Sequence, residues 1–186
     1  MTISKSRRNN IIFLIVIALL LIPQTRHPIQ IVLHKGLALF SPSVINEDES
    51  VVLNDFDWKL RDISGTKINL KDYKGQVIFL NLWATWCPPC IAEMPSVQAL
   101  YNDYNDKIVF FLVTDEETEI IEKFLEKNGY DFNIQQPLSE SPELLKSSSI
   151  PRTFLIDKEG NILINKSGAA NWNSEKVRNT IDDLIK

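Results

Sequence analysis

The chain has 186 residues with ordinary hydrophobic and charged fractions, 44% and 24%, and a net charge of −4. Its length fits one domain with accessory segments. The acidic balance and the lack of a basic stripe in the sequence argue against a nucleic-acid partner. A structural zinc site typically takes about four ligands. Because the sequence has two cysteines and two distant histidines, no metal ion and no other cofactor is expected.

The N-terminal residues carry the features of an export or anchor sequence. Lys5, Arg7 and Arg8 precede an uninterrupted apolar run at residues 11–22. This run is shorter than the about 20 residues of a typical spanning helix, so a cleaved signal peptide and an uncleaved signal-anchor are both open. Residues 23–27 make a poor cleavage site, which favours the anchor. Positive charge before the run places the N-terminus in the cytoplasm.

The chain is therefore divided into four segments. We predict a cytoplasmic tail at residues 1–8, a signal-anchor at 9–25, a juxtamembrane linker at 26–50 and a globular domain at 51–186. The end of the linker is polar and includes the acidic residues 47–49, as in a solvated segment. Either interpretation of the N-terminus exports the domain to the periplasmic side of a bacterial cytoplasmic membrane.

The globular domain has strands and helices in alternation, followed by a late hairpin. Short apolar runs predict strands, and apolar residues at helical spacing predict helices. The expected strands are 58–63, 67–70, 77–83, 108–113, 132–135 (at an edge), 153–156 and 162–164. The expected helical segments are 70–75, 88–104, a helix that ends at Asn128, 142–146 and a last helix from Ser174. This order predicts an α/β fold in which a mixed sheet has helices on both faces.

One helix start is predicted by a capping signature. Thr114 and Glu117 stand three residues apart, which is the spacing of a capping box. The helix that follows is expected to bury four apolar residues, Ile120, Ile121, Phe124 and Leu125.

Both cysteines lie in Trp86-Cys87-Pro88-Pro89-Cys90, between the strand at 77–83 and the helix at 88–104. A strand that delivers two thiols to a helix N-terminus is a redox arrangement, because helix-start amides and the helix dipole stabilise a thiolate. The thiolate of Cys87 is the expected nucleophile in disulfide exchange, and Cys90, one turn later, can resolve the mixed disulfide. A structural disulfide is a poor alternative, since so short a loop constrains the unfolded chain little.

Two motifs resemble the thioredoxin superfamily, and within it the membrane-anchored TlpA/ResA branch. The first is the run 83–90 with Glu93-Met94-Pro95 after it, and the second is the run 150–157. The resemblance covers residues 51–186. It implies a thioredoxin-like fold, a redox-active Cys87–Cys90 disulfide and the activity of a thiol:disulfide oxidoreductase.

Glu93 is a further candidate catalytic residue. At about 100° per residue it falls on the apolar sector of its helix, one turn after Cys90. A partly buried carboxylate has a raised proton affinity, so Glu93 is a candidate to exchange a proton with Cys90. The alternative is a solvent-facing glutamate, and the acidic residue found here in the ResA-like branch favours function. Asn81 stands where thioredoxin itself has a buried aspartate, and because asparagine cannot titrate, proton handling shifts to Glu93.

The resemblance also implies a substrate-binding wall. Pro151 matches the cis-proline of the superfamily, which places the backbone of Ile150 opposite the disulfide, where it can pair with an extended substrate chain. Trp86 is expected to lie beside the thiols and to contact the substrate. Pro88 stiffens the active loop and removes an amide donor from the first helical turn.

The function implied by the resemblance is the reduction of disulfides in exported proteins, with a membrane thiol reductant as electron donor. Apocytochrome c is the substrate that the ResA-like branch suggests, in cytochrome c-type biogenesis. An exported disulfide-forming oxidase is the main alternative. A peroxiredoxin-like peroxidase would need a Thr-x-x-Cys site, and Thr85 stands only two residues before Cys87. A non-catalytic binding module would not need both cysteines.

Overall fold

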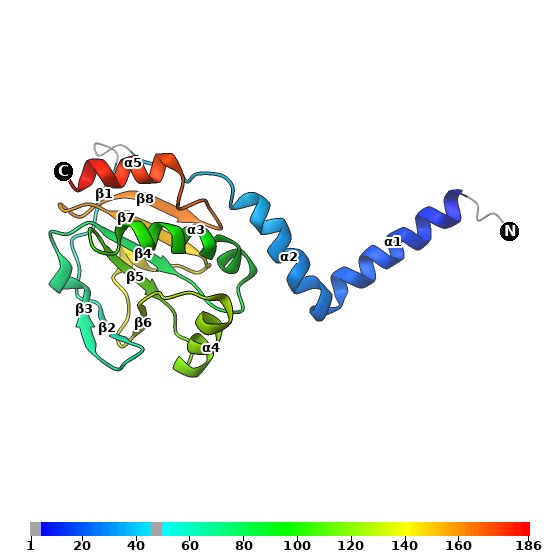
Figure 1. Ribbon diagram of the computed structural model, residues 1–186, viewed down its shortest axis with the longest axis horizontal. Coiled ribbons are helices and arrows are strands. Elements are labelled where there is room, and N and C mark those ends of the chain that lie inside the picture. Colours follow the sequence, from blue (N-terminus) through cyan, green and yellow to red (C-terminus); the bar gives the residue numbers. More distant parts are fainter. Residues whose placement is uncertain (1–4, 46–49) are drawn as a thin grey trace.

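The computed structural model describes residues 5–45 and 50–186 (Figure 1). The beginning of the predicted tail and the acidic residues 47–49 of the predicted linker lie outside these ranges. Within them, an eight-stranded sheet has the order β1-β8-β7-β4-β5-β6-β2-β3. Its strands are β1 (Val51–Val52), β2 (Lys59–Asp62), β3 (Lys67–Asn69), β4 (Ile78–Leu82), β5 (Val109–Val113), β6 (Ile134–Pro137), β7 (Arg152–Ile156) and β8 (Asn161–Ser167).

The sheet is mixed, as the alternation of strands and helices predicts. β4 pairs with β5 and β5 with β6 in parallel, whereas the other pairs are antiparallel. The prediction that residues 132–135 form an edge strand is wrong, because β2 lies beyond β6 with Leu60 opposite Pro137. The local pattern of β6 does not reveal that a strand from the start of the domain returns to pair with it.

The α-helices of the domain cover one face of the sheet. α3 (Pro88–Tyr104), α4 (Thr118–Asn128) and α5 (Glu175–Leu184) bury apolar residues against this face, including Val97, Ile121 and Val177. The other face is covered by residues 53–60 and by the short 3-10 helices η2 (Leu70–Tyr73) and η3 (Glu143–Leu145). The prediction of helices on both faces therefore needs a correction, since the second face has 3-10 turns rather than α-helices.

The capping box predicted at Thr114 does not form. α4 begins at Thr118, and Glu117 is its N-cap residue without a side-chain hydrogen bond to the helix. Thr114 instead extends the sheet, because its N–H donates to the carbonyl of Gln135 at 3.0 Å. Thr114 therefore takes part in strand pairing, although the local signature placed it at the start of the helix.

The buried side of α4 also differs in part from the prediction. Ile121 and Leu125 are buried as expected, and Phe124 is half-buried against the same core. Ile120 is 46% exposed, because it lies on the solvent side of the helix. The last helix agrees with the sequence, since the hydroxyl of Ser174 caps α5 by accepting from the N–H of Val177.

Two helices precede the domain and meet at a sharp bend, with α1 projecting away from the sheet (Figure 1). They are α1 (Lys5–Leu21) and α2 (Pro23–Leu37). In the part of the chain that the structure describes, no single helix has both the length and the apolar character needed to cross a membrane. α1 and α2 satisfy both criteria only as a pair, bent by 93°.

The segment predicted as a linker lies close to the domain over part of its length. α2 packs beside α3, and Nε2 of His27 lies 3.3 Å from the backbone oxygen of Trp86. After α2, the carbonyl of Phe40 accepts from the N–H of Asn171 at 2.9 Å, and the N–H of Ile45 donates to the carbonyl of Leu163 at 2.8 Å. Residues 26–50 therefore include most of α2 and a stretch held against the domain.

Candidate active site

The cysteine pair lies where β4 leads into α3. Cys87 is the N-cap residue of α3, and it forms a disulfide with Cys90 in which the two Cα atoms are 5.2 Å apart. The helix begins at Pro88 because proline has its φ angle already fixed and lacks only an amide hydrogen that the first turn would leave unpaired. Cys90 is the more buried of the two, with 0% of its surface exposed against 3% for Cys87.

The first turn of α3 offers Cys87 few hydrogen-bond donors. Pro88 and Pro89 have no amide hydrogen, so the N–H of Cys90 is the first helical amide that can donate. It lies 3.3 Å from Sγ of Cys87. A thiolate at Cys87 is stabilised by this amide and by the helix dipole, but it lacks the donor that any other residue at position 89 would supply.

A carboxylate that the sequence analysis did not select holds the loop before the cysteines. Glu116, between β5 and α4, accepts from the backbone N–H and from the hydroxyl of Thr85, both at 2.6 Å. Its own carbonyl accepts from Nε2 of Gln136 on β6 at 2.6 Å. The contact joins two loops that are 31 residues apart in sequence, so no local pattern could have indicated it.

Glu93 is fully buried on α3, deeper than the partial burial that the sequence predicts. Its Oε1 accepts from Nδ2 of Asn81 at 2.9 Å, and its Oε2 accepts from Nε1 of Trp172 at 2.8 Å and from the N–H of Ala170 at 3.1 Å. Burial raises the pKa of Glu93 from its usual 4.5 to about 7, although the three hydrogen bonds oppose this shift. A group with this pKa can take up and release a proton near neutral pH.

Asn81 connects Glu93 to the sheet. It lies on β4 directly opposite Thr153 on β7, and its Nδ2 donates to Oγ1 of Thr153 at 2.7 Å as well as to Glu93. Asn81 cannot titrate, yet its amide donates to the carboxyl group of Glu93, which can. Trp172 was not anticipated at all, because its loop before α5 carries no motif and lies 79 residues from Glu93.

The second motif lies beside the first. The Ile150–Pro151 peptide bond is cis, as predicted. Ile150 and Trp86 both line a cavity of about 730 Å³, and the side chain of Trp86 is 64% exposed at its rim. Pro88 lies half-buried at the start of α3, and Pro151 is buried directly before β7.

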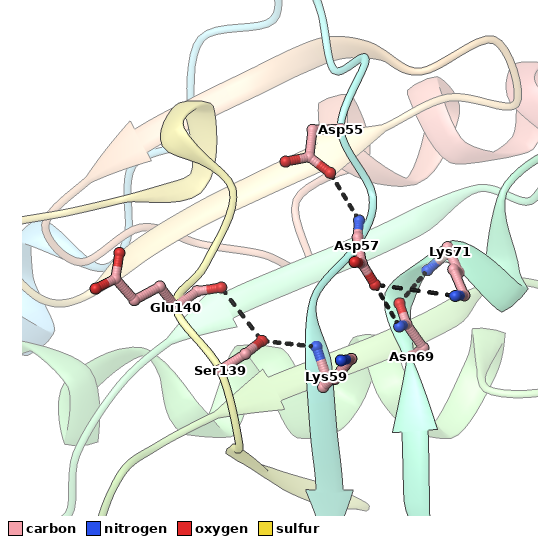
Figure 2. Close-up of polar contacts among 7 residues, drawn as sticks. All are labelled: Asp55, Asp57, Lys59, Asn69, Lys71, Ser139 and Glu140. Atoms are coloured by element: carbon pink, nitrogen blue, oxygen red, sulfur yellow. Dashed lines mark hydrogen bonds and ion pairs between the residues drawn. The ribbon is translucent and has the colours of Figure 1, made fainter.

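Another wall of this cavity is held by hydrogen bonds from Trp58 and from Lys59, the first residue of β2. Ser139 and Glu140 line the cavity, and the N–H of Lys59 donates to Oγ of Ser139 at 3.0 Å (Figure 2). The indole N–H of Trp58 donates to the backbone oxygen of Ser139 at 3.1 Å. On the neighbouring strand, Nδ2 of Asn69 donates to Oδ1 of Asp57 at 2.7 Å, which ties β3 to the segment that leads into β2 (Figure 2). The cavity is therefore lined by residues that are far apart in the sequence, from Trp58 to Ile150.

Across residues 5–45 and 50–186, no three side chains of His, Cys, Asp or Glu come together as ligands of a metal ion would. The groups at the site that can react are the Cys87–Cys90 disulfide and the buried carboxyl of Glu93.

A mixed sheet with a cysteine pair at the N-terminus of a helix and a cis-proline beside it defines a thioredoxin-fold thiol-disulfide oxidoreductase. The chain belongs to the AhpC/TSA family, whose model matches residues 53–164.

Relatives with known names agree with this class. The thiol-disulfide oxidoreductase ResA of Bacillus thuringiensis subsp. konkukian is 29% identical over 185 residues, which are 97% of both chains. ResA of Bacillus cereus is 36% identical over 129 residues, covering 67% of this chain and 70% of the relative. The predicted resemblance to the ResA branch and the predicted enzyme class are confirmed.

Solved structures share the fold. A crystal structure described as a thiol-disulfide oxidoreductase from Bacteroides vulgatus has a TM-score of 0.54 and 33% identity, covering 76% of this chain and 97% of the other. A thiol:disulfide interchange protein DsbE from Chlorobium tepidum has a TM-score of 0.59 and 24% identity, covering 80% and 99%. The thioredoxin-like fold is therefore confirmed.

Proposed function

We propose that this oxidoreductase acts as a reductase of disulfides in exported proteins. The direction of electron flow is inferred from the small number of hydrogen-bond donors at Cys87. Two prolines follow it, so the N–H of Cys90, 3.3 Å from Sγ, is the first amide that can donate. Donors to a thiolate stabilise the reduced form of the pair and make it a stronger oxidant. A helix start with fewer donors therefore favours a reducing pair.

The buried carboxyl of Glu93 supports the same direction. A negative charge on buried Glu93, one helical turn after Cys90 on α3, disfavours a second negative charge on the thiol of Cys90. The reduced form is therefore less stable, and the pair gives up electrons more readily.

The mechanism follows from the order of burial. The thiolate of Cys87 attacks a substrate disulfide and forms a mixed disulfide, with release of one substrate thiol. The thiol of Cys90 then transfers its proton to Glu93 and attacks Sγ of Cys87, which releases the second substrate thiolate and forms the Cys87–Cys90 disulfide. Glu93 is suited to this step because its pKa is about 7.

The substrate is an extended polypeptide. The cavity is lined by Trp86, which directly precedes Cys87, and by Ile150, and its volume of about 730 Å³ can receive side chains of a bound segment. Ile150 supplies backbone groups for pairing with such a segment, and Trp86 supplies an exposed aromatic surface. Pro88, directly after Cys87, and Pro151, directly after Ile150, are the other proposed contacts with the substrate.

The proposed location is the outer side of a bacterial cytoplasmic membrane. Residues 1–46 contain five Lys or Arg and no Asp or Glu, so this part of the chain suits contact with anionic lipid. The apolar side chains of α1 are exposed, including Phe13 and Leu14 at 64% and 63%. We propose that residues 9–25 anchor the domain, with residues 1–8 in the cytoplasm and a membrane thiol reductant as electron donor. Apocytochrome c, in cytochrome c-type biogenesis, is one exported substrate suggested by the resemblance.

The direction is tested by the reduction potential of the Cys87–Cys90 pair. Equilibration with glutathione is expected to give a value near the thioredoxin end of the range, about −270 mV. A value near about −120 mV would instead support an exported oxidase.

The role of the prolines is tested by a matched pair of variants. Pro89→Ala restores the amide at the second helical position, which can donate to the side chain at the N-cap. We expect the pKa of Cys87 to fall by about one unit and the potential to rise by about 30 mV. Pro88→Ala restores an amide at the first position, which points away from the N-cap side chain, and serves as the control. Equal effects in the two variants would contradict the argument.

Substrates are identified by trapping. Cys90→Ser leaves Cys87 able to attack and prevents resolution, so mixed disulfides through Cys87 should accumulate in cells. The absence of trapped exported proteins, with the variant folded and membrane-bound, would refute the proposed substrate class.

A further inference from the structure

The hydrogen-bond partners of Glu93 suit a carboxylate and not a carboxylic acid. The indole N–H of Trp172, the backbone N–H of Ala170 and the amide of Asn81 all donate to it, at 2.8, 3.1 and 2.9 Å. A protonated Glu93 has an O–H that must donate in its turn. Neither a backbone N–H nor an indole N–H can accept a hydrogen bond.

Asn81 is different because its amide carries an acceptor as well as a donor. Its Oδ1 is buried and makes no hydrogen bond with any part of the chain that the structure describes. A half-turn of the amide about the Cβ–Cγ bond exchanges Oδ1 with Nδ2. Oδ1 then takes the place from which Nδ2 now reaches Oε1 of Glu93 at 2.9 Å and Oγ1 of Thr153 at 2.7 Å.

Thr153 can follow this turn. A threonine hydroxyl both donates and accepts, and its hydrogen rotates to suit its partner. In the structure Thr153 accepts from Nδ2 of Asn81. After the turn, the same hydroxyl donates to Oδ1. The two residues lie directly opposite each other on β4 and β7, so neither needs to move its backbone.

We propose that Asn81 and Thr153 form a reversible hydrogen-bond pair that donates to the carboxylate form of Glu93 and accepts from its protonated form. Asn81 and Thr153 are positioning residues in this role, since they act through Glu93. The proposal rests on the proton transfer proposed above. When Cys90 attacks the mixed disulfide, its proton becomes the O–H of Glu93, the Cys87–Cys90 bond forms, and the substrate leaves as a thiolate.

The surroundings of Glu93 leave this role to Asn81. The charged group that acts on Glu93 from β8 is Lys166, which favours the carboxylate. On α3 itself, Cys87 and Cys90 are joined in the disulfide and do not titrate. Among the three hydrogen-bond partners of Glu93, the amide of Asn81 is the one that can satisfy an acid.

The test uses the oxidised full-length protein in detergent micelles, with nuclear magnetic resonance of the side chains. At about pH 9, where Glu93 is ionised, the Nδ2 protons of Asn81 should show a nuclear Overhauser effect to the side chain of Thr153. At about pH 5 this effect should be lost, because Nδ2 has turned away. The same contacts at both pH values would overturn the proposal.

A variant provides a second measurement. In Glu93→Gln, the new side-chain oxygen can accept from Ala170 and Trp172, and the new side-chain NH2 group must then donate toward Asn81. Asn81 is therefore expected to show the low-pH pattern at every pH. The high-pH pattern in this variant would also refute the switch. These measurements need neither substrate nor reduction, so they can contradict the switch while the proposed reductase activity stands. Conversely, a reduction potential of the Cys87–Cys90 pair that contradicts the reductase would leave the switch untouched.

Discussion

The substitution Glu93→Gln removes the titration of the buried carboxyl and keeps its size. In the folded chain the pKa of Glu93 is raised to about 7, whereas an unfolded chain has the usual 4.5. Between these values the folded state binds more protons than the unfolded state. The free energy of unfolding of the wild type therefore falls as the pH rises through this window.

The magnitude follows from the size of the shift. Each pKa unit corresponds to about 1.4 kcal/mol, so the raised pKa of Glu93 makes the wild type lose about 3 kcal/mol of stability between pH 4.5 and 7. The stability that comes from the protonated form of Glu93 in the folded chain is fully present below pH 4.5 and absent above pH 7. Because Glu93 is fully buried, solvent does not appreciably screen its effect on stability.

The assay is urea unfolding of the oxidised wild type and of Glu93→Gln in detergent, at several pH values across this window. Other carboxyl groups titrate equally in both proteins, so the difference between the two curves isolates Glu93. The free energy of unfolding of the variant, relative to that of the wild type, should increase by about 3 kcal/mol as the pH rises from 4.5 to 7. Glu126→Gln, at an exposed position of α4, is the matched control and should follow the wild type. Parallel curves for Glu93→Gln and the wild type would refute the reasoning.

Three further predictions concern the surroundings of the site and the fold. Trp172→Phe removes the indole donor 2.8 Å from Glu93, so a carboxyl carbon titration should show its pKa rise further by about one unit; an unchanged pKa would mean that the bond contributes nothing. Glu116→Ala removes both contacts to the loop before the cysteines and should lower the free energy of unfolding by about 1–3 kcal/mol, measured by urea unfolding. An unchanged free energy of unfolding would mean that the contacts of Glu116 with Thr85 do not stabilise the loop. Gly160→Ala should destabilise by more than about 1 kcal/mol, because φ is +94° and the new Cβ would lie 3.0 Å from the carbonyl oxygen of Leu53. Gly65→Ala has a similar φ, +92°, and open space around it, so an equal loss there would show that the close contact does not matter.

Local sequence patterns determine the part of the site that one element forms alone. The strand at β4 and the helix at α3 are specified by a continuous apolar run and by helical spacing, so the position of Cys87 at the helix start follows from the sequence. The burial of Glu93 also follows in part, because its angle on the helix points it to the core. The same local signals mislead where a distant strand competes, as at Thr114, whose N–H pairs with the carbonyl of Gln135 on β6.

The tertiary structure alone decides which groups surround the carboxyl of Glu93. Its partners come from β4, from the loop before α5 and, through Asn81, from β7, and the indole of Trp172 lies 79 residues away in sequence. The sequence correctly excludes titration by Asn81, but it cannot show that the amide of this residue contacts the buried carboxyl. The physical reason is that hydrogen bonding depends on distance and direction in space, and the pairing of β4 with β7 sets both. The sequence by itself determined the chemistry of the cysteine pair, and the fold decided which neighbours surround the carboxyl of Glu93.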